Sequence, residues 1–235
     1  MEPKVIYEDD EILVLDKPAG WIVNDATTTS GQPTVQQWLH RNFQFPISNF
    51  QTMRNGIVHR LDKETSGVLL VAKTKDAFES LQAQFKARQV KKTYTALVHG
   101  KVEPEEGSIE VPVGRLPWRR DRFGILAGGR EAKTRWRVIS TYSKNYALLE
   151  LFPETGRTHQ IRIHLKYLGH PIVGDEFYAG RKTARDDRKW CPRLFLHASK
   201  IILTHPVTSK KLEFSSVLPQ ELEKALSFFT PTQSL

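Results

Sequence analysis

A series of short runs of apolar and β-branched residues restricts the possible folds of this chain more than any other feature of the sequence. Each run is ended by a turn residue. Runs of this length and composition are typical of β-strands. They occur at Glu11–Asp16, Val68–Ala72, Lys92–His99, Thr134–Ser140 and Ala147–Phe152, with a further apolar stretch at Leu194–Leu203. The predicted strands come in adjacent pairs, without the regular βαβ alternation of a doubly wound sheet. We therefore expect an α+β fold with a mixed, mostly antiparallel sheet.

Helices are predicted where apolar residues recur every three or four positions. The predicted helices are Thr34–Arg41, Asp76–Phe85, Thr158–Leu168 and Pro219–Phe229. In the second of these, Ala77, Leu81 and Phe85 share one face. Thr34 can cap the start of the first helix, and Gly169 can cap the end of the third. No internal repeat or low-complexity linker divides the chain, so residues 1–235 are expected to form a single domain with helices flanking the sheet.

Composition excludes several classes of protein. The 235 residues include 35 Lys and Arg against 26 Asp and Glu, which gives a formal net charge of +9. No run approaches the roughly 18 apolar residues of a membrane span, and the first residues lack the apolar core of a signal peptide. The single cysteine, Cys191, excludes an internal disulfide framework and a cysteine-based zinc site. We expect a soluble, cytoplasmic protein with an anionic partner.

Basic residues gather in two segments that also contain aromatic residues. The first extends from Arg115 to Arg137 and includes Arg119, Arg120 and Arg122; the second extends from Arg181 to Arg193. Trp118, Phe123, Trp136, Tyr178 and Trp190 are interleaved with them and could stack on unpaired bases. Each segment taken alone is more typical of a solvated face or loop with a few core aromatic residues. The pattern therefore favours nucleic acid without establishing it.

The polar segment HRLDKETSG precedes the apolar strand VLLVA, where a rigid strand could present catalytic side chains. One interpretation is structural: Asp62 and the residues after it would form a turn. A hydrolase triad of Ser66, His59 and Asp62 is disfavoured because the three lie too close in sequence, and no G-x-S-x-G elbow is present. The third interpretation makes Asp62 a lone catalytic carboxylate, kept ionised by Arg60 and Lys63.

A second polar segment, ETGRTHQIRIH, joins a predicted strand to the third predicted helix. Arg162 would lie one turn inside that helix, where its planar guanidinium suits bidentate pairing with a carboxylate. His159 and His164 are five residues apart, on different faces of a helix, and the H-E-x-x-H motif is absent. A metal site is therefore not expected.

These segments, taken together in order, resemble the RluA-type pseudouridine synthases. HRLDKETSG resembles the central motif of that family. The remaining motifs, in chain order, are EDDEILVLDKPAG at Glu8–Gly20, KKTYTALVHG at Lys91–Gly100, Glu154–Leu165, Leu168–Asp175, Leu196–Ala198 and His205–Pro206. The resemblance extends from about Val5 to Leu218.

The resemblance implies an isomerase that converts uridine in RNA to pseudouridine, in a central cleft of the pseudouridine synthase fold. Asp62 matches the family's catalytic carboxylate, Arg162 its basic partner, and Tyr94 the tyrosine that packs against the base. Leu196 matches an apolar residue on the face of the uracil. The reaction needs neither water nor electron transfer, so no metal or other cofactor is expected.

The resemblance also implies how the RNA is held. The target uridine must be flipped out of its stem, and Arg60 is expected to fill the gap. His59, Arg157, Arg119 and Arg120 are further candidates for RNA contact. Because the entry strand begins within the first residues, no N-terminal S4 domain is expected, and the chain is expected to act as a monomer. Ribosomal RNA, transfer RNA or both would fit the same site, and the Arg181–Arg193 loop is where specificity is expected.

Two other functions remain open from the sequence. A catalytically silent RNA-binding module would keep the basic segments but lose the site, and the matches at Asp62, Tyr94 and Arg162 disfavour it. A metal-dependent nuclease would need several acidic residues around divalent ions. Near Asp62 the sequence offers only Glu64.

Overall fold

The computed structural model describes residues 1–26, 29, 31–43, 53–117, 119–143 and 145–234. Two compact units form within the chain. The first comprises Met1–Lys91 and Ala198–Val217, and the second comprises Lys92–His197 and Leu218–Leu235. The single domain expected over residues 1–235 stays a prediction.

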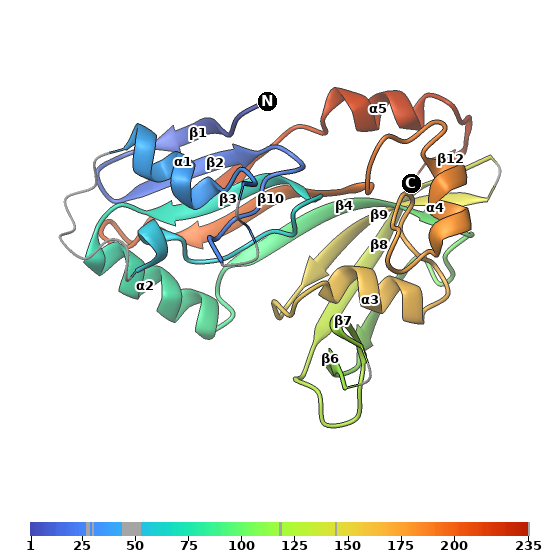
Figure 1. Ribbon diagram of the computed structural model, residues 1–235, viewed down its shortest axis with the longest axis horizontal. Coiled ribbons are helices and arrows are strands. Elements are labelled where there is room, and N and C mark those ends of the chain that lie inside the picture. The colour runs from blue at the N-terminus through green and yellow to red at the C-terminus, as the bar shows by residue number, and fades with distance from the viewer. Residues whose placement is uncertain (27–28, 30, 44–52, 118, 144, 235) are drawn as a thin grey trace. The chain divides into compact units, whose positions relative to one another are not determined.

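The first unit is built on strands of one sheet. They are β1 (Lys4–Glu8), β2 (Ile12–Lys17), β3 (Ser66–Ala72), β10 (Leu196–Thr204) and β11 (Lys211–Ser215), in the order β1-β2-β3-β10 with β11 on β10 (Figure 1). β2 pairs with β3 from Ile12 opposite Ala72 to Lys17 opposite Gly67. Every residue of β3 is buried. This explains why VLLVA is apolar without alternation.

The helices of this unit are α1 (Val35–Asn42), the 3₁₀ turn η2 (Arg54–Gly56) and α2 (Lys75–Lys86). The hydroxyl of Thr34 accepts a hydrogen bond from the N–H of Gln37, as the sequence predicts for an N-cap. Ala77 and Leu81 of α2 are fully buried and pack with β2 and β3 in one apolar cluster. The predicted apolar stripe therefore covers the sheet.

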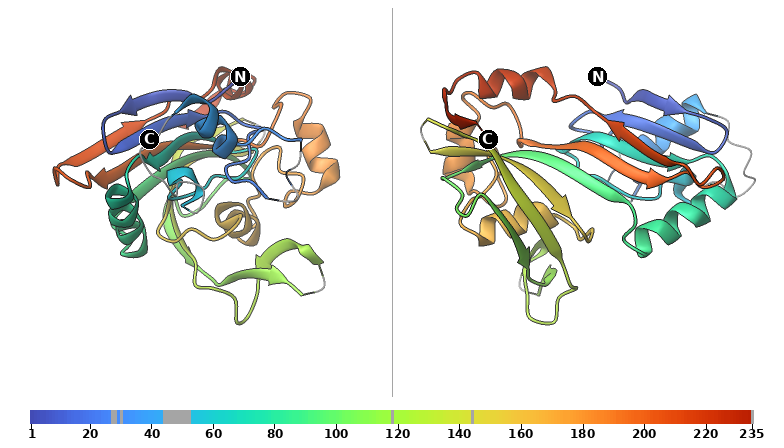
Figure 2. Two further views of the ribbon diagram at one scale, coloured as in Figure 1. Left: turned by 60° about the vertical axis from the view of Figure 1, so that its left-hand side comes forward. Right: turned by 180° about the vertical axis from the view of Figure 1, so that it is seen from behind.

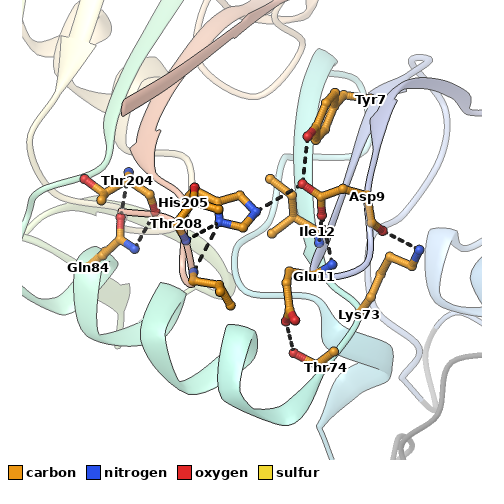
Figure 3. A network of polar contacts seen from close by, with 11 residues as sticks. Tyr7, Asp9, Glu11, Ile12, Lys73, Thr74, Gln84, Thr204, His205 and Thr208 are labelled. Carbon is orange, nitrogen blue, oxygen red and sulfur yellow. Dashed lines mark hydrogen bonds and ion pairs between the residues drawn. The ribbon is translucent and has the colours of Figure 1, made fainter. Parts of the chain in front are cut away.

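Asp9 connects β1, β2 and β10 of the first unit through its carboxylate (Figure 3). Oδ1 accepts the N–H groups of Glu11 and Ile12, both at 2.8 Å, and Oδ2 accepts Tyr7 Oη–H at 2.7 Å. His205 Nδ1 accepts the N–H groups of residues 207 and 208, so its proton is on Nε2, which lies 3.1 Å from Oδ2. Burial raises the pKa of Asp9, but these hydrogen bonds outweigh it and lower the pKa.

Asp9→Asn is expected to lower the free energy of unfolding by about 1–2 kcal/mol at neutral pH. Because the folded-state pKa of Asp9 is depressed, its contribution is complete above its unfolded value of about 3.8 and is lost as the pH falls below it. Urea unfolding at pH 7 and pH 3.5 should show the difference between wild type and variant shrinking in acid. Asp10→Asn, at the exposed neighbouring carboxylate, serves as control. An equal difference at both pH values would contradict this assignment.

The strands of the second unit pair antiparallel with one another. They are β4 (Lys91–His99), β9 (Tyr146–Pro153), β8 (Lys133–Tyr142), β5 (Glu106–Glu110) and β12 (Pro231–Ser234). β8 and β9 form the hairpin that the sequence predicts. A smaller hairpin, β6 (Val113–Leu116) and β7 (Arg119–Ile125), extends from this sheet beside α3 (Figure 2). The helices are α3 (Gln160–Tyr167), α4 (Arg181–Asp187) and α5 (Gln220–Leu226).

The predicted α+β class with a mostly antiparallel sheet is confirmed, and two local predictions are wrong. The third helix begins at Gln160 rather than Thr158, because His159 has a left-handed backbone (φ 55°). The Arg181–Arg193 segment, expected to be a loop, begins with α4. The sequence did not predict α4, because its buried face consists of only Ala184 and Asp187 and therefore shows no apolar periodicity. No helix in the described part of the chain has the length and apolar character to span a membrane.

Candidate functional site

Asp62 lies in the turn immediately before β3. Its carbonyl oxygen accepts the N–H of Thr65 at 3.1 Å, which closes the turn. Leu61 and Thr65 are buried, whereas the side chain of Asp62 is only partly buried. Gly67 follows with φ +113°, and a Cβ there would lie 2.2 Å from the carbonyl oxygen of Ala198. Only glycine fits, so the chain turns sharply into β3 and fixes the position of the loop.

Lys17, the last residue of β2, holds the same loop from beneath. Its side chain is fully buried. Nζ donates to the carbonyl oxygens of Pro18 and Trp21, both at 2.9 Å, and of Lys63 at 3.2 Å. An ammonium group has three N–H donors, and these bonds use all of them. The Lys-Pro turn is therefore tied through Lys17 to the residue next to Asp62.

Lys17→Met is expected to destabilise the protein by about 2–3 kcal/mol, because the carbonyl oxygens of Pro18 and Trp21 lose a buried charged donor. The carbonyl oxygen of Lys63 keeps the N–H of Gly20 at 2.8 Å. Urea unfolding followed by circular dichroism measures this loss. Lys63→Met is the matched control, because the Lys63 side chain is exposed and, within the described residues, donates only to Gln32 Oε1. If Lys17→Met unfolds at the same urea concentration as wild type, the buried ammonium does not hold the turn.

His59 braces this loop against β3. Its Nε2 accepts the N–H of Leu70 at 2.9 Å, and its ring stacks on Phe85 with centroids 5.0 Å apart. An Nε2 that accepts a hydrogen bond leaves the proton of the neutral ring on Nδ1. This bonding supports a structural contribution from His59, and its contact with RNA stays a prediction. Arg60, between His59 and the turn, is exposed.

Arg162 in the first turn of α3 is buried and forms a bidentate ion pair with Asp175. Nε lies 2.7 Å from Oδ2 and Nη2 lies 2.9 Å from Oδ1. Oδ1 also accepts the N–H groups of Phe177 and Tyr178, at 3.0 and 3.1 Å. The guanidinium carbon lies 5.1 Å from the ring centroid of Tyr178 and 5.5 Å from that of Phe177. The bidentate pairing with a carboxylate that the sequence suggests for Arg162 is thus made with Asp175, and the pairing of Arg162 with Asp62 stays a prediction.

Tyr94 and Leu196 belong to the second unit, which includes the first two residues of β10. Tyr94 is on β4 opposite Leu151, and its partly buried ring packs against the core of this unit. Leu196 begins β10 and is 3% exposed. The first unit thus holds His59, Arg60 and Asp62, and the second holds Tyr94, Arg162 and Leu196. That the two sets meet in one cleft stays a prediction.

The histidines considered for metal binding have other contacts. His164 is fully buried between Thr134 Oγ1 at 3.0 Å and the carbonyl oxygen of Val111 at 3.2 Å, and burial lowers its pKa. His159 Nδ1 lies 2.9 Å from Tyr178 Oη. Within the described ranges, no three His, Cys, Asp or Glu side chains converge as metal ligands would.

Comparison with known proteins gives a consistent result. Residues 11–167 match the model of a family described as RNA pseudouridylate synthase. The chain belongs to this family. Ribosomal large subunit pseudouridine synthase D of Nitrosomonas europaea is 40% identical over 95% of this chain and 64% of its own length. An uncharacterized RNA pseudouridine synthase of Bacillus subtilis is 37% identical over 96% of this chain and 72% of its own length. The chain thus spans about two thirds of these relatives.

A solved structure supports the same family assignment. The human RNA pseudouridylate synthase domain containing 1 superposes with a TM-score of 0.76 at 28% identity, over 99% of this chain and 90% of that one. The resemblance read from the motifs is therefore confirmed. RNA pseudouridylate synthases are isomerases, so the predicted enzyme class is confirmed with it.

The basic residues expected to contact RNA are only partly described in this RNA pseudouridylate synthase. Arg119 is exposed on β7; the side chain of Arg120 and all of Trp118 lie outside the described residues. Arg157 is partly buried, and its Nε donates to the carbonyl oxygen of Glu131 at 2.9 Å. In the same unit, Arg115 lies over the ring of Phe123, with 5.1 Å between guanidinium carbon and centroid.

Sequence reasoning missed two residues that hold the site of this family member. Asp175 was within a recognised motif, but nothing in its spacing from Arg162 indicates a pair. Lys17 ends an apolar run, and a lysine in that position is usually solvated. The roles of Asp175 and Lys17 are therefore visible only in the three-dimensional contacts.

Proposed function

We propose that this chain isomerises uridine to pseudouridine in RNA, with Asp62 as the essential carboxylate. The match of residues 11–167 to the RNA pseudouridylate synthase family carries the proposal. It is supported by the turn that fixes Asp62 before β3 while leaving its side chain partly accessible. The names of several relatives favour ribosomal RNA of the large subunit as substrate, with transfer RNA as the alternative. We propose further that the enzyme acts in the cytoplasm as a monomer.

In the proposed reaction the ionised carboxylate of Asp62 attacks C1′ of the ribose or accepts the proton that starts elimination. The bond between N1 and C1′ breaks, and the uracil leaves as an anion. The base turns and C5 bonds to C1′ while the bond between Asp62 and C1′ breaks or, in the elimination form, while Asp62 returns the proton to the ribose. The hydrogen on C5 then leaves as a proton, and N1 gains a proton. Atoms and electrons balance without water or an oxidant.

Other residues have supporting roles in this proposal. Tyr94 packs against the base and accepts the C5 proton, and Leu196 covers the face of the uracil. Arg162 acts as the basic partner of Asp62, while Asp175 fixes the direction of the guanidinium. A uridine within a stem must be flipped to reach a carboxylate, and Arg60 fills the gap. The cation–aromatic pairs around β7 offer additional RNA contacts.

Tritium release from ribosomal RNA transcripts labelled at C5 of uridine tests this function, because the C5 hydrogen is lost in every turnover. Wild-type protein should release tritium with and without EDTA. Pseudouridine mapping by carbodiimide labelling would then locate the modified uridine. Absence of tritium release from both ribosomal and transfer RNA transcripts would favour a silent RNA-binding module, and release abolished by EDTA would contradict the metal-independent mechanism.

A further inference from the structure

Lys92 is a partly buried cation, and few contacts within the second unit stabilise its positive charge. It lies on β4, and its Nζ donates to the carbonyl oxygen of Thr155 at 3.4 Å. This distance is longer than the usual 2.7–3.2 Å of such bonds. Within the described residues, Thr155 is its only hydrogen-bond or ion-pair partner, so two of its three N–H donors are left for water or a ligand.

Burial of Lys92 has an electrostatic cost. Desolvation lowers the pKa of its ammonium to about 8, and in the part of the chain that the structure describes no carboxylate offsets the effect. A desolvated charge without an ionic partner is unfavourable for folding, so such groups are concentrated at functional sites. A bound anion would stabilise the desolvated ammonium of Lys92.

Gly156 leaves the space beside this ammonium open. Its backbone does not lie in the left-handed region that favours glycine, so conformation does not explain the residue. A Cβ built at this position would meet only Lys92 Nζ, at 3.9 Å, and Gly156 itself is exposed. An alanine would therefore fit the fold but cover the ammonium. A glycine without a conformational reason often marks the close approach of a ligand.

The position of Lys92 relative to Tyr94 indicates which anion fits. The two residues are two positions apart on β4, so their side chains share a face with Cα atoms about 7 Å apart. Partly buried aromatic rings are the platforms on which unstacked bases pack in RNA-binding proteins. The phosphate of a nucleotide lies one ribose away from its base, and a lysine is a point charge well suited to phosphate.

We propose that the ammonium of Lys92, left uncovered by Gly156, binds a phosphate oxygen next to the nucleotide whose base packs on Tyr94. This inference rests on the proposed function, since it assigns part of the RNA to the same site. Lys92 contributes binding energy and orients the flipped nucleotide; it takes no part in bond breaking.

Binding measured without turnover tests the proposal. The full chain with Asp62→Asn is titrated with an unmodified large-subunit ribosomal RNA transcript over a range of KCl concentrations. Adding Lys92→Met should raise the Kd about tenfold, the effect of one charge-assisted hydrogen bond. It should also reduce the slope of log K against log salt by about 0.7–0.9, as for one lost phosphate contact. Lys92→Arg should stay within about threefold of the parent.

Two further variants make the result specific. Gly156→Ala should weaken binding as Lys92→Met does, with an unchanged urea midpoint. Lys91→Met removes one charge from the preceding, exposed position of β4, where Nζ donates to the carbonyl oxygen of Arg88. It should leave the Kd within about twofold, which shows that net charge alone is not responsible.

An unchanged Kd and salt slope in Lys92→Met would overturn the proposal. A second result would also overturn it. If Lys92→Met with Asp62 intact kept the Kd but lowered the rate of tritium release at saturating RNA, the charge of Lys92 would act on the uracil and not on a phosphate. Failure of the proposed function is distinguishable, because it appears as absence of tritium release by wild type, whereas the binding series needs no turnover.

Discussion

Asp62→Asn is expected to reduce tritium release by about 10⁴-fold or more while folding and RNA binding are retained. An amide has nearly the shape of the carboxylate, so the turn that is closed by the backbone of Asp62 and Thr65 should persist. A neutral amide can neither attack C1′ nor accept a proton, so both forms of the proposed mechanism require the loss. Single-turnover tritium release with enzyme in excess measures the chemical step directly.

Glu64→Gln is the matched control, since it removes a second carboxylate from the same loop. We expect it to retain most of the activity. Full activity in Asp62→Asn would refute the proposed role of Asp62. If Glu64→Gln alone abolished the reaction, the catalytic carboxylate would have been assigned to the wrong residue of the loop.

Local sequence patterns were sufficient for the elements around Asp62. The apolar run at Val68–Ala72 predicted a buried strand, and the polar residues before it predicted a turn, because both depend on neighbours in sequence. The stripe of Ala77 and Leu81 predicted α2 for the same reason. The family resemblance depends on these segments, and it is confirmed.

The contacts that support the site could not be predicted, because they join distant segments. Lys17 meets Lys63 across 46 positions, and Arg162 meets Asp175 across 13. Strands β6, β7 and β11 were missed, since half-exposed pairs of strands have no strong apolar pattern. The start of α3 depends on the left-handed backbone of His159, a residue whose type does not by itself indicate that conformation.

Asp175→Asn is expected to lower the free energy of unfolding by about 3–5 kcal/mol, because it removes one partner of a buried ion pair. The side chain of Asp175 is 0% exposed and that of Arg162 is 8% exposed. An asparagine would turn an NH₂ donor toward donors of the guanidinium or toward the N–H groups of Phe177 and Tyr178. Arg162 would be left with a buried charge that the neighbouring aromatic rings offset only in part.

Urea unfolding of Asp175→Asn, Arg162→Met and the double variant separates this explanation from a packing defect. The double variant should be more stable than the sum of the two single losses predicts, because no unpaired charge remains. Asp186→Asn breaks an exposed pair with Lys189 in the same unit and should leave the urea midpoint nearly unchanged. Additive losses would mean that the pair is energetically uncoupled, and Asp175 could then not be what fixes the Arg162 guanidinium.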